Sequence, residues 1–388
     1  MYQLRDYQQQ ASDAAVQYFK DRKRQRNAVI VLPTGSGKSL VIADIASRLD
    51  GRTLVFQPSK EILEQNYHKM CSYGVIDCSV YSASAGRKEV NRITFATIGS
   101  VINNPNLFAG FNNIIIDECH LVNPAEGMYR DFLDRLKCKV LGLTATPYRL
   151  VSYRMGSMLK FITRSRPCVF SEVIYQVQVG YLLERGYLAN LNYYAMDPDD
   201  WNESNLKSNS TGADYTEQSV VEEYERIGFY DYLVSIVKRL LNPKSGIKRK
   251  GILVFTRFTK EAEQLVREIH GSAIVTGKTS KRDREAILDR FKNGEIKVVA
   301  NVGVLTTGFD YPALDTVVMA RPTMSLSLWY QIVGRAIRPC PGKDAGWIVD
   351  LCGNIKRFGE VKDLELRDSG RGKWAVFNHR RQLTNVFY

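Results

Sequence analysis

The stretch Ala28-Val29-Ile30-Val31-Leu32-Pro33-Thr34-Gly35-Ser36-Gly37-Lys38-Ser39 decides the fold of the chain. Five apolar residues at 28–32 stand before turn residues and predict a buried strand, while apolar residues recur at helical spacing over 38–49. A strand, a glycine-rich turn and a helix in this order are the frame of a phosphate-binding loop. Leu32 replaces the first glycine of the general G-x-x-x-x-G-K-[ST] pattern, so the match fails at one position.

The residues of this loop suit a nucleoside triphosphate with a magnesium ion. Gly35 and Gly37 allow the backbone to turn so that successive N–H groups and the start of the following helix face the phosphates. Lys38 reaches the β- and γ-phosphates as a point charge, and the Ser39 hydroxyl is a ligand for Mg²⁺. We therefore predict ATP and Mg²⁺ as cofactors, with contacts from Pro33, Thr34, Gly35, Ser36, Gly37, Lys38 and Ser39. The alternative is a glycine-rich turn with a surface lysine.

The composition is that of a globular protein with an excess of cations. The chain has 388 residues, enough for two core-sized domains, and 44% of them are hydrophobic and 24% charged. The formal net charge of +13 suits a polyanionic partner, although charge also serves solubility alone. Because no segment approaches about 18 uninterrupted apolar residues and no apolar signal core opens the chain, we expect a cytoplasmic protein without membrane contact. The seven cysteines form no C-x-x-C pair, which predicts reduced thiols.

Short apolar strands alternate with helices in both halves of the chain. In the first half the strands are predicted at 28–32, 52–57, 92–96, 113–117 and 139–143. In the second half they are predicted at 251–255, 273–276, 296–302, 315–320 and 346–350. This alternation predicts an α/β fold with mostly parallel, doubly wound sheets, in which ligands bind at the carboxyl ends of the strands.

The chain divides into four predicted parts. Residues 1–150 form an α/β domain with the phosphate-binding loop, and 246–355 form a second domain without such a loop. Between them, 151–245 is an irregular basic connector with helical and loop segments, in which the polar stretch 197–214 is expected to be a mobile loop. Aromatic residues interleave with the cations of this connector, which suits either a nucleic-acid surface or a solvated basic face. Residues 356–388 are a basic tail without an assignment.

Three further groups fit ATP binding and hydrolysis. Asp117 and Glu118 end a hydrophobic strand, where Asp117 can hold Mg²⁺ and Glu118 can orient and deprotonate the attacking water. Arg335 and Arg338 are three residues apart on a helix predicted at 325–337 and can stabilise charge on a transferred γ-phosphoryl group. The amide of Gln8 matches the N6 and N7 edge of adenine. Each group alone has an ordinary explanation, namely a chance strand end, a solvated helix face or a helix glutamine.

Taken in order, these motifs resemble those of the superfamily 2 helicases over nearly the whole chain. Asp117-Glu118-Cys119-His120 is similar to the D-E-x-H box of that superfamily, and Thr144-Ala145-Thr146 to its coupling motif. In the second half, Val254-Phe255-Thr256-Arg257, 301–310 and 331–338 match the last three motifs. Within the superfamily, Asp-Glu-Cys-His, Gly-Leu-Thr-Ala-Thr-Pro and Val-Leu-Thr-Thr-Gly-Phe-Asp resemble the bacterial RadD-like DNA-repair group.

The resemblance implies two tandem RecA-like domains with ATP in the cleft and a nucleic-acid track across both. It implies nucleotide contacts outside the loop from Arg5, Gln8, Gly308, Asp310 and Gln331. It implies catalytic roles for Lys38, Asp117, Glu118, Arg335 and Arg338. It implies that nucleotide state is coupled to the grip on nucleic acid by His120, Thr144 and Thr146. It implies contacts to the nucleic-acid backbone, with little sequence specificity, from Ser59, Lys60, Thr97, Arg257, Thr306 and Thr307.

The resulting prediction is an ATP-dependent DNA helicase, translocase or remodelling ATPase in DNA repair or recombination, with single-stranded or branched DNA as its partner. Two alternatives stay open. One is an RNA-directed helicase, which a comparison of DNA with RNA as stimulants would separate. The other is a nucleotide-gated switch that holds DNA without translocating, which would show slow hydrolysis and no strand displacement.

Overall fold

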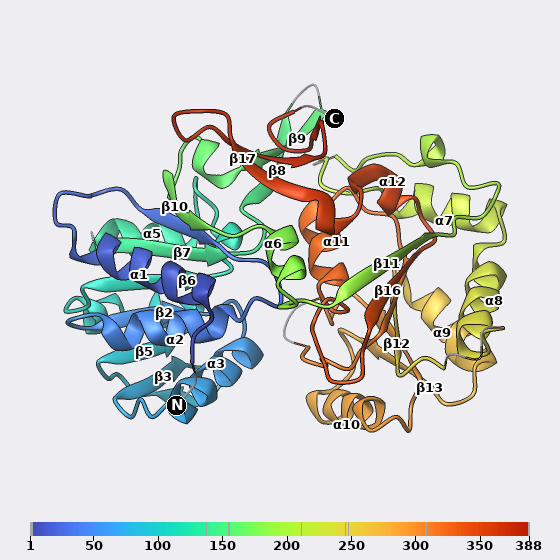
Figure 1. The fold of residues 1–388 in the computed structure, drawn as a ribbon, viewed down its shortest axis with the longest axis horizontal. Coiled ribbons are helices and arrows are strands. Elements are labelled where there is room, and N and C mark those ends of the chain that lie inside the picture. The colour runs from blue at the N-terminus through green and yellow to red at the C-terminus, as the bar shows by residue number, and fades with distance from the viewer. Residues whose placement is uncertain are drawn as a thin grey trace.

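The computed structural model describes residues 3–136, 138–153, 156–210, 212–244, 246, 248–306 and 309–386. Two α/β domains lie side by side and are joined through α6 (Val179–Glu184), as Figure 1 shows. Each domain is built around a mostly parallel sheet with buried central strands, so the predicted α/β fold of two domains is confirmed. No helix of the described residues has both the length and the apolar character needed to cross a membrane.

The first domain contains an eight-stranded sheet in the order β10-β1-β7-β6-β2-β5-β3-β4. Its strands are β1 (Ala28–Val31), β2 (Thr53–Phe56), β3 (Cys78–Ser82), β4 (Arg87–Lys88), β5 (Ile93–Ala96), β6 (Asn113–Asp117), β7 (Lys139–Thr144) and β10 (Glu172–Gln176). Neighbouring strands are parallel except β3 and β4. Its helices are α1 (Asp6–Lys20), α2 (Lys38–Arg48), α3 (Lys60–Ser72), α4 (Ile98–Val101) and α5 (Met128–Leu136), with short 3₁₀ turns η1 (Pro105–Phe108) and η2 (Cys119–Leu121).

The second domain contains a six-stranded, all-parallel sheet in the order β11-β16-β15-β12-β14-β13. Its strands are β11 (Asn190–Ala195), β12 (Ile252–Thr256), β13 (Ser272–Thr276), β14 (Val298–Val302), β15 (Thr316–Ala320) and β16 (Ala345–Asp350). Its helices are α7 (Glu217–Arg226), α8 (Phe229–Leu241), α9 (Thr259–Glu268), α10 (Lys281–Lys292), α11 (Leu326–Val333) and α12 (Asn354–Phe358), with a 3₁₀ turn η4 (Glu203–Asn205). Ser280 caps helix α10, because its side chain accepts the N–H of Asp283.

The ten predicted strands all form, but edge strands of both sheets escaped prediction. β10 and β11 come from the segment predicted as a connector, and they complete the first and second sheets respectively. β11 has the sequence Asn-Leu-Asn-Tyr-Tyr-Ala, and only Leu191 of it is fully buried. Because an edge strand is partly open to water, it needs no continuous apolar run, and this removes the pattern on which the prediction relied.

Residues 364–382 of the predicted basic tail fold into a small antiparallel sheet. Its strands are β17 (Leu364–Asp368), β18 (Trp374–Asn378) and β19 (Arg381–Gln382). This sheet lies near the hairpin of β8 (Tyr148–Tyr153) and β9 (Gly156–Phe161), as Figure 1 shows. The Asn385 side chain accepts the N–H of Phe161 at 3.0 Å. The C-terminal segment also reaches the second domain, where Trp329 of α11 donates to the carbonyl of Gly359 at 3.2 Å. The segment therefore ties the two domains together.

Candidate nucleotide site and nucleic-acid groove

The phosphate-binding loop lies between β1 and α2, as predicted. Gly35 and Gly37 have φ angles of 83° and 78°, in the left-handed region that residues with a side chain rarely adopt. At Gly37 a Cβ atom would also lie only 2.6 Å from the Nε2 of Gln8. Glycine is thus required there by both the backbone and its surroundings, and the free N–H groups at the start of α2 face the cleft as an anion site.

Two side chains of α1 form hydrogen bonds to the phosphate-binding loop. The Tyr7 hydroxyl donates to the carbonyl of Ser36 at 2.6 Å, and the Gln8 Nε2 donates to the same carbonyl at 2.8 Å. The Oε1 of Gln8 accepts the backbone N–H of Arg5 at 2.9 Å, and the Arg5 guanidinium lies 4.4 Å from the ring centre of Tyr187. Gln8 therefore supports the loop, while its contact with adenine stays a prediction. The contacts of Tyr7 and Tyr187 were not predicted, because they join segments that are far apart in the chain.

The acid pair lies at the carboxyl end of β6, across from the loop lysine. Glu118 adopts a left-handed φ of 48°, and its Oε1 lies 3.6 Å from the Nζ of Lys38. Burial and the neighbouring carboxylate of Glu118 raise the pKa of Asp117. Burial would also raise the pKa of Glu118, but Lys38 and hydrogen bonds from His120 and Thr144 lower it below its usual range. Glu118 is thus held in its ionised form, which is the form that a general base requires.

The three residues predicted to couple nucleotide and nucleic acid form one buried network with Glu118. The His120 Nδ1 lies 2.9 Å from the Thr144 Oγ1 and 3.2 Å from the Thr146 Oγ1. The Thr144 hydroxyl donates to Glu118 at 3.3 Å, and it accepts the N–H of Thr146 at 3.0 Å. The network therefore links Glu118 to the end of β7 by direct hydrogen bonds, while its coupling role stays a prediction.

The arginines of the second domain do not lie on a helix face, contrary to the sequence prediction. α11 ends at Val333 with Gly334 as its C-cap, so Arg335 and Arg338 lie in the turn that follows. A Cβ atom at Gly334 would lie 2.6 Å from the Thr34 Cγ2, so the helix ends where it packs on the phosphate-binding loop. That contact lies between domains and leaves no trace in helical periodicity.

Both arginines hold a loop of their own domain. The buried Arg335 guanidinium donates to the carbonyls of Thr306 and Phe309 at 2.6 and 2.7 Å, and burial, with the nearby Arg338, lowers its pKa to about 9. Arg338 is ion-paired with Asp310. Arg335 thus holds the carbonyls of Thr306 and Phe309 in place. Arg338 is paired with the carboxylate of Asp310, and a phosphate group of the nucleotide can replace that carboxylate.

A cavity of about 610 Å³ lies between the domains and collects most of the predicted nucleotide residues. Its volume is in the range of small-molecule sites. The predicted residues that line it are Thr34, Gly35, Gly37, Lys38, Ser39, Asp117, Glu118, Asp310, Gln331, Arg335 and Arg338. Pro33, Ser36, Arg5 and Gln8 lie outside the lining, and Gly308 lies outside the described residues. Asn66 and Lys69 of α3 also line the cavity. They were not predicted as nucleotide contacts, because Lys60 of the same helix was predicted to contact nucleic acid.

The donors for a magnesium ion are present in the cavity. Ser39 supplies a hydroxyl and Asp117 a carboxylate, whose Oδ2 lies 3.4 Å from the Asn66 Nδ2. Within the described residues, no group of three or more His, Cys, Asp or Glu side chains could hold a metal ion. This set fits Mg²⁺, which usually takes one or two protein oxygens and completes its shell with phosphates and water. Bound there, the ion would neutralise phosphate charge.

A groove runs from the first domain to the second beside the cavity. It consists of two hollows of about 440 and 500 Å³, which share Pro58, Glu118 and Leu121. Thr97 lines the first hollow, and Ser59 and Thr306 line the second. Lys60 lies at the side, where its Nζ donates to the carbonyl of Ser84 at 2.6 Å.

Besides Lys60, two of the predicted nucleic-acid residues do not line this groove. Thr307 lies outside the described residues. Arg257 is mostly buried and bound to Asp214, so its guanidinium is engaged inside the second domain. Asp214 belongs to the stretch 197–214, which was expected to be a mobile loop. A local sequence pattern could not predict this ion pair, because its partners are 43 residues apart.

Known families match both domains. Residues 1–149 match the family described as "Type III restriction enzyme, res subunit", and residues 232–340 match "Helicase conserved C-terminal domain". A "51.5 kDa protein" of a Lactococcus phage is 27% identical over 80% of this chain and 62% of its own. The Saccharomyces cerevisiae protein called "Putative ATP-dependent helicase IRC3" is 25% identical over 90% of this chain and 51% of its own. The chain thus spans about half to two thirds of these relatives.

A further relative and a solved structure agree with these matches. The "DNA 3'-5' translocase XPB2" of Sulfurisphaera tokodaii is 24% identical over 87% of this chain and 79% of its own. The Type ISP restriction-modification enzyme LlaBIII, solved bound to DNA, superposes with a TM-score of 0.66 at 20% identity, over 90% of this chain and 27% of that one. With a family match in each domain and a cleft built from both, the chain has two RecA-like helicase domains in tandem and is similar over both of them to ATP-dependent helicases.

Proposed function

We propose that this protein hydrolyses ATP to move along or remodel DNA. The observation that carries the proposal is the position of Glu118, which lines the interdomain cavity and both hollows of the groove. A nucleic-acid backbone in the groove therefore lies next to the carboxylate proposed to activate water. Binding on one side changes the geometry on the other, and this is the physical requirement for coupling.

DNA is the proposed partner rather than RNA. The relatives named as a DNA translocase and as a DNA-bound restriction enzyme support DNA, and the net charge of +13 supports a polyanion of either kind. A role in DNA repair and a grouping with the RadD-like enzymes extend this proposal from the motif resemblance. ATP with Mg²⁺ is the proposed cofactor pair, held by Lys38, Ser39 and Asp117.

The deciding experiment measures ATP hydrolysis against single-stranded, duplex and forked DNA and against RNA at one salt concentration. DNA is expected to accelerate hydrolysis, and a Lys38→Ala variant sets the background. Stronger stimulation by RNA would reverse the choice of partner. Displacement of a DNA-bound block during hydrolysis then separates a motor from a switch that only holds DNA.

A further inference from the structure

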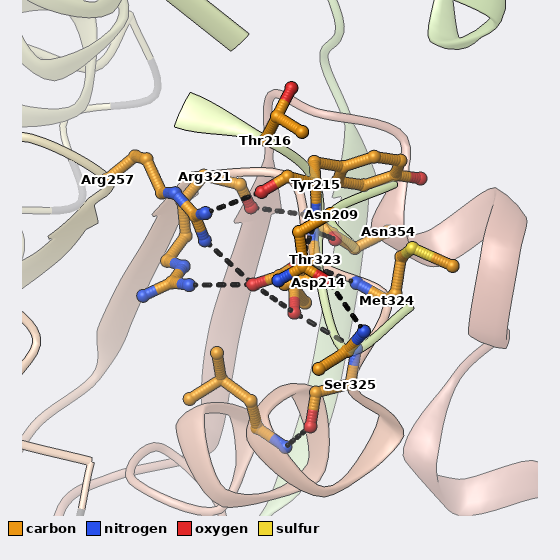
Figure 2. Close-up of polar contacts among 12 residues, drawn as sticks. Asn209, Asp214, Tyr215, Thr216, Arg257, Arg321, Thr323, Met324, Ser325 and Asn354 are labelled. Atoms are coloured by element: carbon orange, nitrogen blue, oxygen red, sulfur yellow. Dashed lines mark hydrogen bonds and ion pairs between the residues drawn. The ribbon is translucent and has the colours of Figure 1, made fainter. Parts of the chain in front are cut away.

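Besides the N–H of the adjacent Tyr215, Asp214 gathers four donors from other segments of the second domain around one carboxylate, as Figure 2 shows. Its Oδ2 lies 2.7 Å from the Nη1 of Arg257 and 3.2 Å from the Nη2 of Arg321, and it accepts the Thr323 hydroxyl at 3.4 Å. Its Oδ1 accepts the backbone N–H of Met324 at 3.0 Å. Arg257 follows β12 and Arg321 follows β15, so the donors lie at the carboxyl edge of the sheet, where α/β domains bind ligands.

The donors around Asp214 have the chemistry of an oxyanion site. Two guanidinium groups, a hydroxyl and a backbone N–H are the groups that bind phosphate oxygens in nucleic-acid backbones. The side chains of Arg257 and Arg321 are each only 13% exposed, and the carboxylate of Asp214 is ion-paired with both. The Nε of Arg321 is buried and has no hydrogen-bond partner among the described residues. The Asp214 carboxylate therefore leaves one donor of the site unsatisfied.

The site adjoins the end of the groove. Met324 is followed by Ser325, which lines the hollow that also contains Thr306. Met324 itself lines another hollow of about 430 Å³, together with Ser152 and Ser157 of the β8–β9 hairpin. The N–H of Met324 that holds Asp214 thus lies one residue along the chain from the lining of the groove, and its residue lines the next hollow.

The loop that carries Asp214 closes this hollow from the second domain. Gly212 lies against the hairpin of the first domain, since a Cβ atom there would be 2.9 Å from the Cβ of Ser157. The two ends of the loop are pinned together, because the N–H of Thr216 donates to the carbonyl of Lys207 at 2.7 Å. Thr216 also caps α7. Between these ends, the carboxylate of Asp214 is the main tether to the sheet, aided by the carbonyl of Tyr215, which accepts from Arg257 at 2.9 Å.

We propose that Arg257, Arg321, Thr323 and the Met324 N–H form a binding site for a DNA backbone phosphate, and that Asp214 is an internal competitor for it. In the free protein the carboxylate fills the site and holds the loop across the path of the strand. A backbone phosphate takes its place on the two guanidinium groups, and the loop leaves the hairpin. This inference rests on the proposed function, because it names one contact and one gate of the same DNA groove.

The test measures binding of a fluorescently labelled oligothymidylate to the full chain without nucleotide. Asp214→Asn keeps the size of the side chain but removes the competing charge, so its affinity for DNA is expected to rise by about tenfold. Glu203→Gln is the matched control, because it removes another carboxylate partner of an arginine, Arg357, from the same segment and is expected to leave DNA affinity unchanged. Adding Arg321→Ala to Asp214→Asn is expected to abolish the gain and to reduce the salt dependence of binding by about one phosphate contact.

Each outcome has a separate meaning. If the natural chain binds DNA and Asp214→Asn binds it no more tightly, the proposal that Asp214 competes with DNA is overturned and the proposed function stands. If neither binds DNA, both proposals fall. Hydrogen exchange on the natural chain avoids any effect of the substitution on folding. The amide of Asn209, which donates to the carbonyl of Asp214 at 2.8 Å, is expected to exchange faster when DNA is bound, and slower or equal exchange would overturn the release of the loop.

Discussion

The two domains build the nucleotide cavity in different ways. In the first domain, Lys38, Glu118 and Thr144 follow strand ends of one sheet and contact one another directly. In the second, Arg335 and Arg338 hold a loop that follows β14. They reach the nucleotide cavity because the end of α11 packs on the phosphate-binding loop, with Gly334 against Thr34. The first set is organised within its own domain, whereas the second depends on how closely the domains approach.

This difference separates what each domain contributes to the reaction. A site that is complete within one domain binds nucleotide whether or not the domains close. A group supplied across the interface acts only when they do, so it can make hydrolysis depend on DNA. Variants of the second domain are therefore expected to affect turnover more than nucleotide binding, and the following experiments test that division.

The largest effect is expected from Arg338→Ala. Arginines supplied to a transferred phosphoryl group contribute about 10³- to 10⁵-fold to kcat, and loss of Arg338 is expected to fall in this range while KM for ATP changes little. Steady-state kinetics with saturating DNA make the measurement. Arg338→Lys serves as the control, since it keeps the charge but not the planar geometry, and it is expected to recover only part of the rate. An effect confined to KM would show that Arg338 only binds substrate.

The next largest effect on kcat is expected from Glu118→Gln. A general base contributes about 10²- to 10⁴-fold, so kcat is expected to fall by this amount while ATP still binds. Lys38→Ala is the informative comparison, because a phosphate ligand is needed for both binding and turnover and both are expected to weaken. Binding of a fluorescent ATP analogue together with phosphate release separates the two. Nearly normal hydrolysis by Glu118→Gln would remove its role as base.

The same contrast explains what the sequence could and could not predict. The phosphate-binding loop, the acid pair and the threonine motif are local patterns at strand ends, and the cavity or its hydrogen-bonded network contains each of them. The end of α11 and the pairing of Arg257 with Asp214 depend on contacts between segments far apart in the chain. No local pattern records such contacts, so the helix was predicted too long and the ion pair of Arg257 with Asp214 was not predicted.

A smaller effect, which tests the interface itself, is expected from Gly334→Ala. The added Cβ would lie 2.6 Å from the Thr34 Cγ2 and 3.1 Å from the carbonyl of Tyr330, so the domains must move apart. Because a misplacement of about 1 Å in an active site can lower the rate by about 10²-fold, DNA-stimulated kcat is expected to fall by about this amount. Gly180→Ala is the control glycine, because its Cβ would meet only the carbonyl of Lys362 at 3.9 Å. If Gly334→Ala keeps the full DNA-stimulated rate, close approach of the domains is not what assembles the site.

The smallest effect concerns Gln8, which lies in the first domain but outside the cavity. If its amide reads adenine, Gln8→Ala is expected to reduce the preference for ATP over GTP by on the order of tenfold. The same amide also supports the loop through the carbonyl of Ser36, so the substitution alone mixes two effects. Tyr7→Phe separates them, because it removes only the other hydrogen bond to that carbonyl. We expect Tyr7→Phe to weaken ATP and GTP equally and Gln8→Ala to weaken ATP more, as measured by kcat/KM for both nucleotides; an unchanged ratio in Gln8→Ala would leave Gln8 as a support of the loop alone.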